Sequence, residues 1–381
     1  MRIVMFYHSL ISDWNHGNAH FLRGIASELL ARGHDVAVYE PSDGWSLTNL
    51  LAEHGPAAVE RFSLAYPTLK SVRYNPQRVN LQKALDSAQL VIVHEWNPPA
   101  LVKRIGERRK AGGFRLLFHD THHRMVSDPR SILSMDLSEY DGVLAFGSVL
   151  RDMYAANGWD KRAWTWHEAA DTRVFRPLTR KTREGDVVWV GNWGDDERAA
   201  ELREFLIEPV KDLKLAAAVY GVRYPRNART CLRNAGIEYR GWLANFDVPG
   251  VFSRYAFTVH VPRRAYATQL PGIPTIRPFE AMSCGIPLIC SPWNDSEGLF
   301  QAGHDYLLAH TGAEMRHCMR MLLEDSGLRQ SLARNARRTI LARHTCAHRV
   351  DELLQIYARL TRPIRSRAPS RCAAARKRSA S

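Results

Sequence analysis

The sequence predicts an α/β protein built from two Rossmann-like domains, each with a parallel sheet. Three observations support this fold class. The chain opens with a strand at 2–8, a polar loop, an amphipathic helix and a second strand at 35–41, which is the order that starts a Rossmann-like unit. The predicted strands are nearly continuous apolar runs, as expected when helices cover both faces of a parallel sheet. A polar connector at 176–185, RPLTRKTREG, separates two such series.

The first series predicts a domain over residues 1–178. Its first helix has apolar residues at helical spacing, from Phe21 to Leu30, and Gly33 is placed to end it. Further helices are expected at about 98–110 and 148–157. The expected strands are 2–8, 35–41, 90–96, 114–120 and 141–147.

The second series predicts a domain over residues 179–345. An acidic helix follows its first strand, a short helix precedes its last strand, and helices are expected at about 313–325 and 328–343. A last helix at 346–361 is expected to return to the first domain. The expected strands are 186–191, 213–221, 237–241, 257–261 and 286–290.

Composition favours a globular protein of the cytoplasm. Of 381 residues, 45% are hydrophobic and 24% are charged, values typical of soluble domains. No apolar run approaches the length of a membrane-spanning helix, and the N-terminus reads as a first strand rather than a signal peptide. The 6 cysteines have no metal-type spacing, so we expect free, mostly buried thiols in a reducing compartment.

The formal net charge of +14 is concentrated at the C-terminus. Residues 362–381 contain seven Lys or Arg and no acid, and their composition predicts a disordered tail. A solubilising role is slightly favoured. The alternative is weak attraction to anionic lipid at the inner face of a membrane, or to nucleic acid. No specific nucleic-acid partner is expected, because the rest of the chain is only mildly basic.

Ligands of open parallel sheets bind beyond the carboxyl ends of the strands, so a cleft between the two domains is expected to be lined by the loops that follow strands. These loops are 8–18, 94–97, 119–124, 191–198, 221–227, 262–276 and 291–297. In the first of them, His16, Gly17 and Asn18 stand just before a helix. They predict either an anion site at the helix start or an ordinary N-cap by Asn18 or Asp13, and the residues do not decide between the two.

Titratable side chains follow two strands of the first domain. They are His94, Glu95, His119, Asp120 and His122. One interpretation is proton transfer in the cleft, since histidine titrates near neutral pH. The other is that the groups hydrogen-bond to one another and hold a loop. A metal site is not expected, because the cluster lacks zinc spacing.

The segment 262–280 predicts a site for a diphosphate in the second domain. It is a long loop entering a helix, and it brings Arg263, Arg264 and Arg277 beside the free amides of Thr275 and Ile276. Glu280, one turn inside the helix, either accepts hydrogen bonds from a ribose diol or pairs with Arg277. The residues alone do not decide between these two roles of Glu280. The acids of 191–198 suit a helix N-terminus, so that loop is expected only to line the cleft.

Several motifs of the second domain carry a resemblance. They are VGNWGDDER (190–198), VYG (219–221) with IEYRGWL (237–243), RPFEAMSCGIPLI (277–289), LFQAGHDYLL (299–308) and HTCAHRVDELL (344–354). With this spacing, residues 185–355 resemble the glycosyltransferase-like domain of CgeB-type spore-maturation proteins, in the GT-B superfamily near glycosyltransferase family 4. The first domain matches more loosely, through GHDVAVYEP (33–41), the His-Asp after a strand and HEAADTRVFRP (167–177).

The resemblance implies a GT-B fold, with a nucleoside-diphosphate sugar in the second domain and an acceptor on the first. It places Glu280 at the ribose, as the second acid of an E-x7-E pattern. The first acid of that pattern would fall at Gly272, which has no side chain to touch the donor sugar. His119 matches a strand-end histidine near the reacting sugar in many family 4 enzymes, and Asp120 follows it.

These inferences together predict an enzyme of glycan synthesis that moves a sugar from a nucleoside-diphosphate sugar to an acceptor hydroxyl, without metal or cofactor. The acceptor is a glycan, a lipid-linked glycan or a small molecule. His119 and Asp120 are the predicted acid–base or acceptor-orienting residues. Two alternatives remain open at this point. One is a nucleotide-sugar epimerase on the same fold, and the other is an inactive scaffold that binds a nucleotide or a glycan, which the departure at Gly272 favours.

Overall fold

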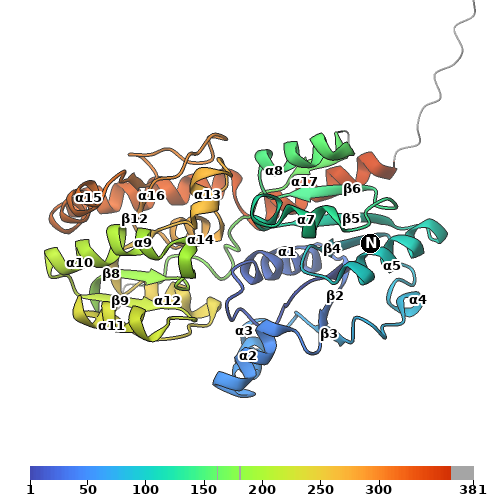
Figure 1. The fold of residues 1–381 in the computed structure, drawn as a ribbon, viewed down its shortest axis with the longest axis horizontal. Helices are drawn as coiled ribbons and strands as arrows, with labels where there is room; N and C mark the ends of the chain where they lie inside the picture. Colours follow the sequence, from blue (N-terminus) through green and yellow to red (C-terminus); the bar gives the residue numbers. More distant parts are fainter. Residues whose placement is uncertain (161, 180–181, 362–381) are drawn as a thin grey trace, which may run out of the picture.

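The computed structural model describes residues 1–160, 162–179 and 182–361, and it shows two α/β lobes side by side (Figure 1). Each lobe is built on one parallel sheet. Within the described residues, the strand order is β3-β2-β1-β4-β5-β6-β7 in the first sheet and β10-β9-β8-β11-β12-β13 in the second. The predicted fold class is therefore confirmed. The basic segment 362–381, predicted to be disordered, lies outside the described residues.

The first lobe surrounds its sheet with helices, as Figure 1 shows. Its strands are β1 (Arg2–Phe6), β2 (Asp35–Pro41), β3 (Ser71–Tyr74), β4 (Leu90–His94), β5 (Arg115–Asp120), β6 (Gly142–Ala145) and β7 (Ala163–Thr165). Its helices are α1 (Ala19–Ala31), α2 (Trp45–His54), α3 (Ala57–Ala65), α4 (Leu81–Ala84), α5 (Pro99–Ala111), α6 (Arg124–Ser127), α7 (Pro129–Leu133) and α8 (Ser148–Tyr154), with a π-helical turn η1 (Ala155–Trp159).

The second lobe repeats this architecture. Its strands are β8 (Gly185–Val190), β9 (Ala217–Tyr220), β10 (Ile237–Tyr239), β11 (Tyr255–His260), β12 (Leu288–Cys290) and β13 (Leu307–Leu308). Its helices are α9 (Ala199–Leu202), α10 (Glu208–Leu213), α11 (Arg226–Asn234), α12 (Val248–Phe252), α13 (Arg264–Thr268), α14 (Ile276–Cys284), α15 (Gly312–Glu324) and α16 (Ser326–Arg343), and short turns are η2 (Asp195–Glu197), η3 (Arg203–Ile207) and η4 (Asn245–Asp247).

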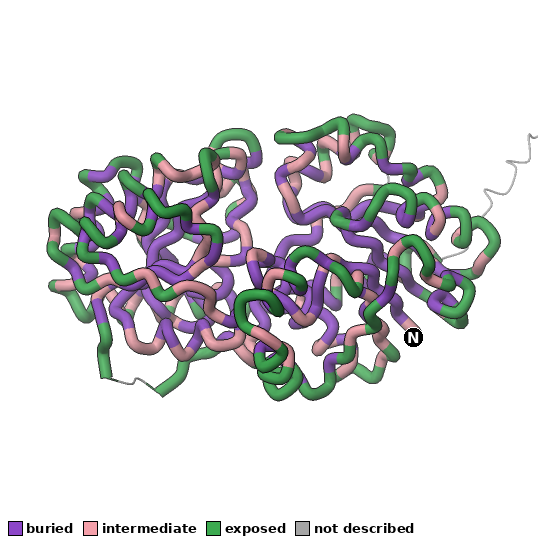
Figure 2. Tube along the Cα trace, turned by 60° about the horizontal axis from the view of Figure 1, so that its bottom comes forward, coloured by how far each residue is buried: buried purple, intermediate pink, exposed green. Residues whose placement is uncertain are grey.

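The central strands form the core of each lobe. Every residue of β4, β6 and β11 is buried, and the buried trace runs through the middle of both lobes in Figure 2. Both faces of each strand are covered, so an apolar residue is stabilised at every position rather than at alternate ones. This is why the apolar runs predicted these strands correctly.

The elements that the sequence analysis missed are short or half-exposed. The edge strands β3 and β7 contain mostly exposed or half-exposed residues, so they have no apolar run to mark them. Helices α2, α3, α4, α11 and α12 were also missed. The loop 262–276 was expected to have no helix before the start of α14, and this was wrong, because α13 lies inside it.

The last helix, α17 (Cys346–Thr361), packs on α1 of the first lobe. Arg32, the residue that follows α1, forms an ion pair with Asp351 at 2.5 Å. Gly24 permits the close approach, since a Cβ built on it would lie 2.4 Å from Cys346 Sγ. The five cysteines among the described residues are free, and all but Cys231 are buried. No helix in the described part of the chain is long and apolar enough to cross a membrane.

Candidate active site

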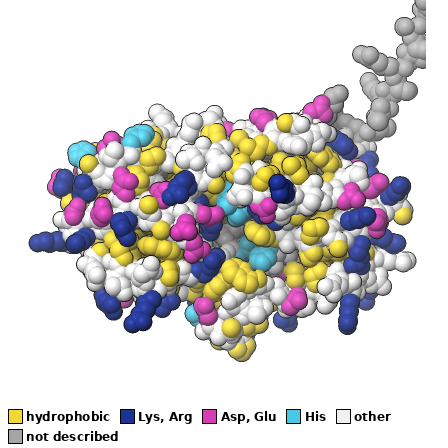
Figure 3. All heavy atoms as spheres, in the orientation of Figure 1, with side chains coloured by type: hydrophobic (Ala, Val, Ile, Leu, Met, Phe, Trp, Pro, Cys, Tyr) yellow, Lys and Arg dark blue, Asp and Glu magenta, His cyan; other side chains and the backbone are white. Residues whose placement is uncertain are grey.

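A cavity of about 660 Å³ lies between the two lobes, and the space-filling view shows the hollow at the centre of the molecule, with histidine side chains around it (Figure 3). Its volume falls in the range of small-molecule sites. Residues from the loops after β1, β4, β5, β8, β9 and β11 line it, at the place where ligands of parallel sheets bind. The loop 291–297 was also expected there, but none of its residues lines the cavity.

The wall from the second lobe carries four arginines, Arg198, Arg223, Arg263 and Arg277, and no Asp or Glu among the described lining residues. Three of the four already have carboxylate partners. Arg263 pairs with Glu197 and Arg277 pairs with Glu280. Arg223 also pairs, with Asp195 at 2.8 Å, and its side chain is 44% exposed. The charged side chains that line this wall are all cationic, which suits it to an anion.

Arg198 differs from the other three, because no carboxylate lies within ion-pair distance of it in the described part of the chain. Its guanidinium donates to the carbonyl oxygens of Asn192 at 2.7 Å and Val261 at 3.2 Å. Its Nε atom is buried and has no hydrogen-bond partner among the described residues. Burial lowers the pKa of Arg198 to about 10, and the charge of Arg263 adds to the effect. A cation held this way is stabilised when an anion enters the cavity.

The start of α14 adds backbone donors to the same wall. Thr275, Ile276 and Arg277 line the cavity, and no side chain among the described residues caps the helix. The first amides of a helix have no partner within it and carry partial positive charge. Thr275 has φ 59° and ψ −178°, a conformation that residues other than glycine adopt at a cost of about 1–3 kcal/mol and that often marks ligand sites.

Glu280 lies fully buried beneath this wall and does not line the cavity. It pairs with Arg277, accepts a hydrogen bond from Asn245 Nδ2 at 2.6 Å and stands 3.1 Å from His20 Nδ1 of α1. Burial would raise the pKa of Glu280, but Arg277, His20 and Asn245 together hold it below its usual value. The ion pair with Arg277 is therefore made. The ribose contact stays a prediction.

The two neighbouring arginines of the predicted diphosphate site lie in different places in the structure. Arg263 lines the cavity. Arg264 begins α13 and is held by Glu201 of α9 at 2.9 Å, with its side chain 52% exposed, and it is not a lining residue. The structure thus contradicts its prediction as part of a diphosphate cradle.

The wall from the first lobe contains the predicted loop residues His16, Gly17 and Asn18. The capping alternative is wrong. Asn18 makes no capping hydrogen bond, and its Nδ2 donates to Glu168 Oε1 at 3.1 Å. Asp13 accepts from Arg23 at 2.8 Å, from Trp242 Nε1 and from the Asn245 amide, each at 3.0 Å. Asp13 thereby joins the two lobes instead of capping α1.

Four of the predicted histidine and acidic residues lie behind this wall, not on it. His94, Glu95, His119 and Asp120 are fully buried, and of the predicted group only His122 lines the cavity. The ring of His119 hydrogen-bonds through Nδ1 to the Tyr7 hydroxyl at 2.6 Å, and burial lowers its pKa to about 3. Burial raises the pKa of Asp120 to about 6, although it accepts from the Tyr154 hydroxyl at 2.8 Å.

These contacts explain why sequence reasoning put the four residues in the cleft. A strand that ends in polar residues indicates a sheet edge, but it does not show whether the next loop folds over them. Here Thr121 and His122 cover the end of β5 and face the cavity. The catalytic assignment of His119 and Asp120 stays a prediction, and in this structure their side chains hold the wall in place.

Other residues of the cavity were missed, among them Arg198, Glu168, His8 and Trp96. Glu168 lies on the segment that follows β7, and burial raises its pKa to about 8. Two features of the sequence could have indicated these residues. Arg198 directly follows the acidic residues 195–197, and Glu168 is an acid in the motif 167–177. In the part of the chain that the structure describes, no group of three or more His, Cys, Asp or Glu side chains is placed to hold a metal ion.

Solved structures with this architecture include HepE of Anabaena in complex with UDP and glucose. It has a TM-score of 0.66 at 14% identity, and the match covers 94% of this chain and 99% of that chain. Sucrose-phosphate synthase of Thermosynechococcus elongatus has a TM-score of 0.66 at 13% identity, with coverage of 94% and 99%. The chain has the GT-B fold.

This GT-B chain is also similar to an α-glucosyltransferase in complex with UDP, with a TM-score of 0.66, 11% identity and coverage of 94% and 100%. Residues 198–355 match the model of a family described as glycosyl transferase-like. A search of curated proteins finds no match. The fold and the family model together confirm the prediction of a glycosyltransferase at this level.

Proposed function

We propose that the chain transfers a sugar from a nucleoside-diphosphate sugar to an acceptor hydroxyl, without a metal ion. The observation that carries this proposal is Arg198, a partly buried cation with no carboxylate partner among the described residues, beside Arg263, Arg277 and the uncapped start of α14. A diphosphate would complete this set of donors. Similar structures were solved with UDP, which makes UDP the first nucleotide to test.

The proposed chemistry breaks the bond between the anomeric carbon and the diphosphate oxygen. The electron pair leaves with the nucleoside diphosphate, the acceptor oxygen bonds to the carbon, and the hydroxyl proton passes to the departing diphosphate. Arginines and helix amides aimed at the leaving group stabilise the charge that develops on it, and they act most strongly in a cavity closed to water.

The proposal extends to a CgeB-like enzyme near glycosyltransferase family 4, on the motifs of residues 185–355. One position departs from that family. Gly272 has φ 86°, and a Cβ built on it would lie 2.8 Å from Glu297 Oε1. Glu297 fills this space and binds the first lobe, accepting from the Ser148 amide at 2.8 Å and contacting His167 Nε2 at 3.0 Å. We therefore assign no retaining mechanism.

Calorimetric titration with UDP, GDP, ADP and dTDP, each with and without EDTA, tests the proposal. One nucleotide that binds equally well in both conditions supports a metal-independent donor site and names the base for a sugar screen. Loss of binding in EDTA would contradict only the metal independence and would leave the proposed donor site standing. If a folded chain binds none of the four, the inactive scaffold that Gly272 favours becomes the better candidate.

A further inference from the structure

The two walls of the cavity differ in charge. Among the described lining residues of the first lobe there is neither Lys nor Arg, and the only carboxylates are Asp13 and Glu168. Its imidazoles add no charge near neutral pH, because burial lowers the pKa of His8 to about 4 and that of His122 to about 2. All four lining arginines lie on the other wall. An anionic group on the first wall would therefore meet no cation among the side chains that line that wall.

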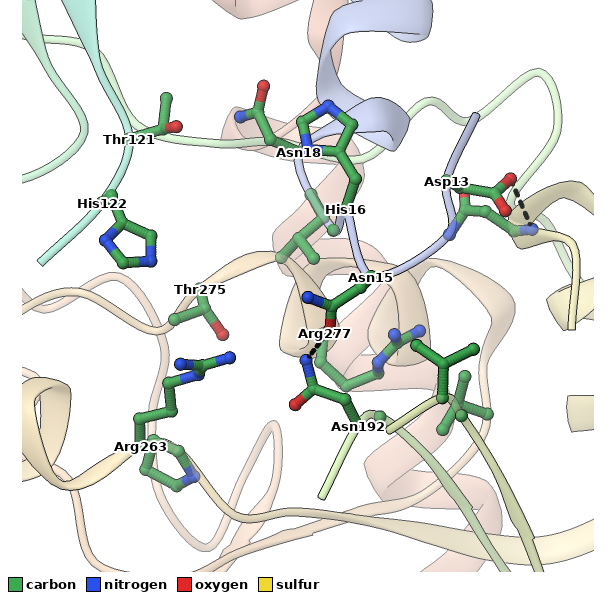
Figure 4. Close-up of a pocket in the computed structure, with 18 of the residues that line it drawn as sticks. Asp13, Asn15, His16, Asn18, Thr121, His122, Asn192, Arg263, Thr275 and Arg277 are labelled. Carbon is green, nitrogen blue, oxygen red and sulfur yellow. Dashed lines mark hydrogen bonds between the residues drawn. The ribbon is translucent and has the colours of Figure 1, made fainter. Parts of the chain in front are cut away.

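Three polar atoms of this wall are buried and have no hydrogen-bond partner in the described part of the chain. They are His16 Nε2, Asn18 Oδ1 and His122 Nδ1, and Figure 4 shows their side chains along one side of the cavity, opposite Arg263, Arg277 and Asn192. Buried polar atoms are normally paired with protein groups, water or a ligand, and these three belong to side chains that line the cavity. An amide oxygen can only accept. A sugar hydroxyl can donate to it, whereas an ionised phosphate or carboxylate cannot.

Trp96 supplies an apolar surface on the same wall. It follows β4, and 43% of it is exposed although it lines a cavity. The Arg124 guanidinium lies 4.3 Å from the Trp96 ring centroid and is itself paired with Glu95. The ring of His122 meets it edge-on at 5.1 Å. A ring held in this way offers a rigid face on which the C–H groups of a sugar can pack, with polar groups around its edge.

From this arrangement we infer that the acceptor is a neutral sugar ring, part of a glycan or glycoside without phosphate or carboxylate on that ring, packed on Trp96 and hydrogen-bonded to His16, Asn18 and His122. The inference rests on the proposed function, because it names the acceptor of the same transfer. It narrows the set of acceptors, since a sugar whose phosphate must enter the cavity beside Trp96 is excluded.

Saturation-transfer NMR on the full chain tests the inference with defined probes. The neutral probes are the methyl glycosides of glucose, galactose, mannose and N-acetylglucosamine. The charged probes are glucose 6-phosphate, mannose 6-phosphate and glucuronate. Each is measured with the nucleotide that calorimetry selects and also on the nucleotide-free chain. We expect at least one neutral probe to bind roughly tenfold more tightly than every charged probe, a difference of about 1.4 kcal/mol.

Variants locate the binding. W96A should abolish saturation transfer to the neutral probe, W96F should keep part of it, and L64A should change nothing, because Leu64 is 81% exposed and does not line the cavity. Nucleotide affinity should stay within twofold of wild type in all three. Equal or tighter binding of a charged probe, binding of no neutral probe, or an unchanged signal in W96A would overturn the inference. Each of these results leaves the nucleotide titration, and so the proposed function, to be judged separately.

Discussion

Replacing Arg198 with methionine should weaken nucleotide binding strongly and lower the stability of the fold only slightly. The fall of its pKa from 12.5 to about 10 through burial corresponds to roughly 3 kcal/mol of unfavourable free energy for the charged form. Its three hydrogen bonds, to the carbonyls of Asn192 and Val261 and to Asn192 Oδ1, contribute about 1.5 kcal/mol each, at the low end for a charged donor. The two effects largely cancel, so we expect R198M to lower the free energy of unfolding by no more than about 2 kcal/mol.

The effect on binding should be much larger. A charge-assisted hydrogen bond to a phosphate contributes about 1.5–3 kcal/mol, so the dissociation constant of the selected nucleotide should rise roughly 10- to 150-fold. R264M is the matched control, because Arg264 is half-exposed and pairs with Glu201 away from the cavity. It should change the dissociation constant less than twofold.

Calorimetry gives the affinity of each variant, and urea unfolding gives its stability. Wild-type affinity in R198M would refute the reasoning, because the unpaired cation would then have no part in the site. A loss of more than about 3 kcal/mol of stability in R198M would show that Arg198 serves the fold. Equal weakening in R264M would mean that only net charge matters.

Three further predictions follow from other contacts. E280Q removes the buried charge that pairs with Arg277 and faces His20, so it should destabilise the chain by about 3–5 kcal/mol and weaken nucleotide binding; urea unfolding and calorimetry check this, with E238Q, an exposed partner of Arg240, as the control. The pKa of Glu168 is raised by burial from 4.5 to about 8, so its protonated form stabilises the fold below pH 4.5 and this stability is lost as the pH rises toward 8. Urea unfolding should therefore show E168Q gaining up to about 5 kcal/mol over wild type between pH 4.5 and 8, and a pH-independent difference would contradict the assignment. E297A removes the contacts with Ser148 and His167 of the first lobe, so small-angle scattering of the nucleotide-free chain should show a larger radius of gyration; no increase relative to the control E238A would show that other contacts hold the lobes together.

The sequence by itself determined the two parallel sheets and most of the central strands. These features depend on local pattern, since an apolar run predicts a strand covered on both faces. It also indicated the strand ends that line the cavity, apart from β12, whose following loop 291–297 was expected there and does not line it. Thr275, Ile276, Arg277, Arg263 and His122 were all predicted and do line the cavity. The edge strands β3 and β7 were not predicted, because their exposed and half-exposed residues form no such apolar run.

Only the tertiary structure decided which side chains face the cavity. His119 and Asp120 are the last residues of β5, and His122 lies two residues further along the chain. The loop that starts at Thr121 folds over His119 and Asp120 and leaves them buried, whereas His122 lines the cavity. Arg263 and Arg264 are adjacent in the sequence. Because α13 begins at Arg264, only Arg263 lines the cavity. Arg198 follows three acidic residues, and local pattern assigns this segment to a helix start. Only the placement of the chain around β8 and β11 shows that Arg198 has no carboxylate partner among the described residues. Burial and pairing depend on contacts between residues far apart in the sequence, and local pattern does not encode them.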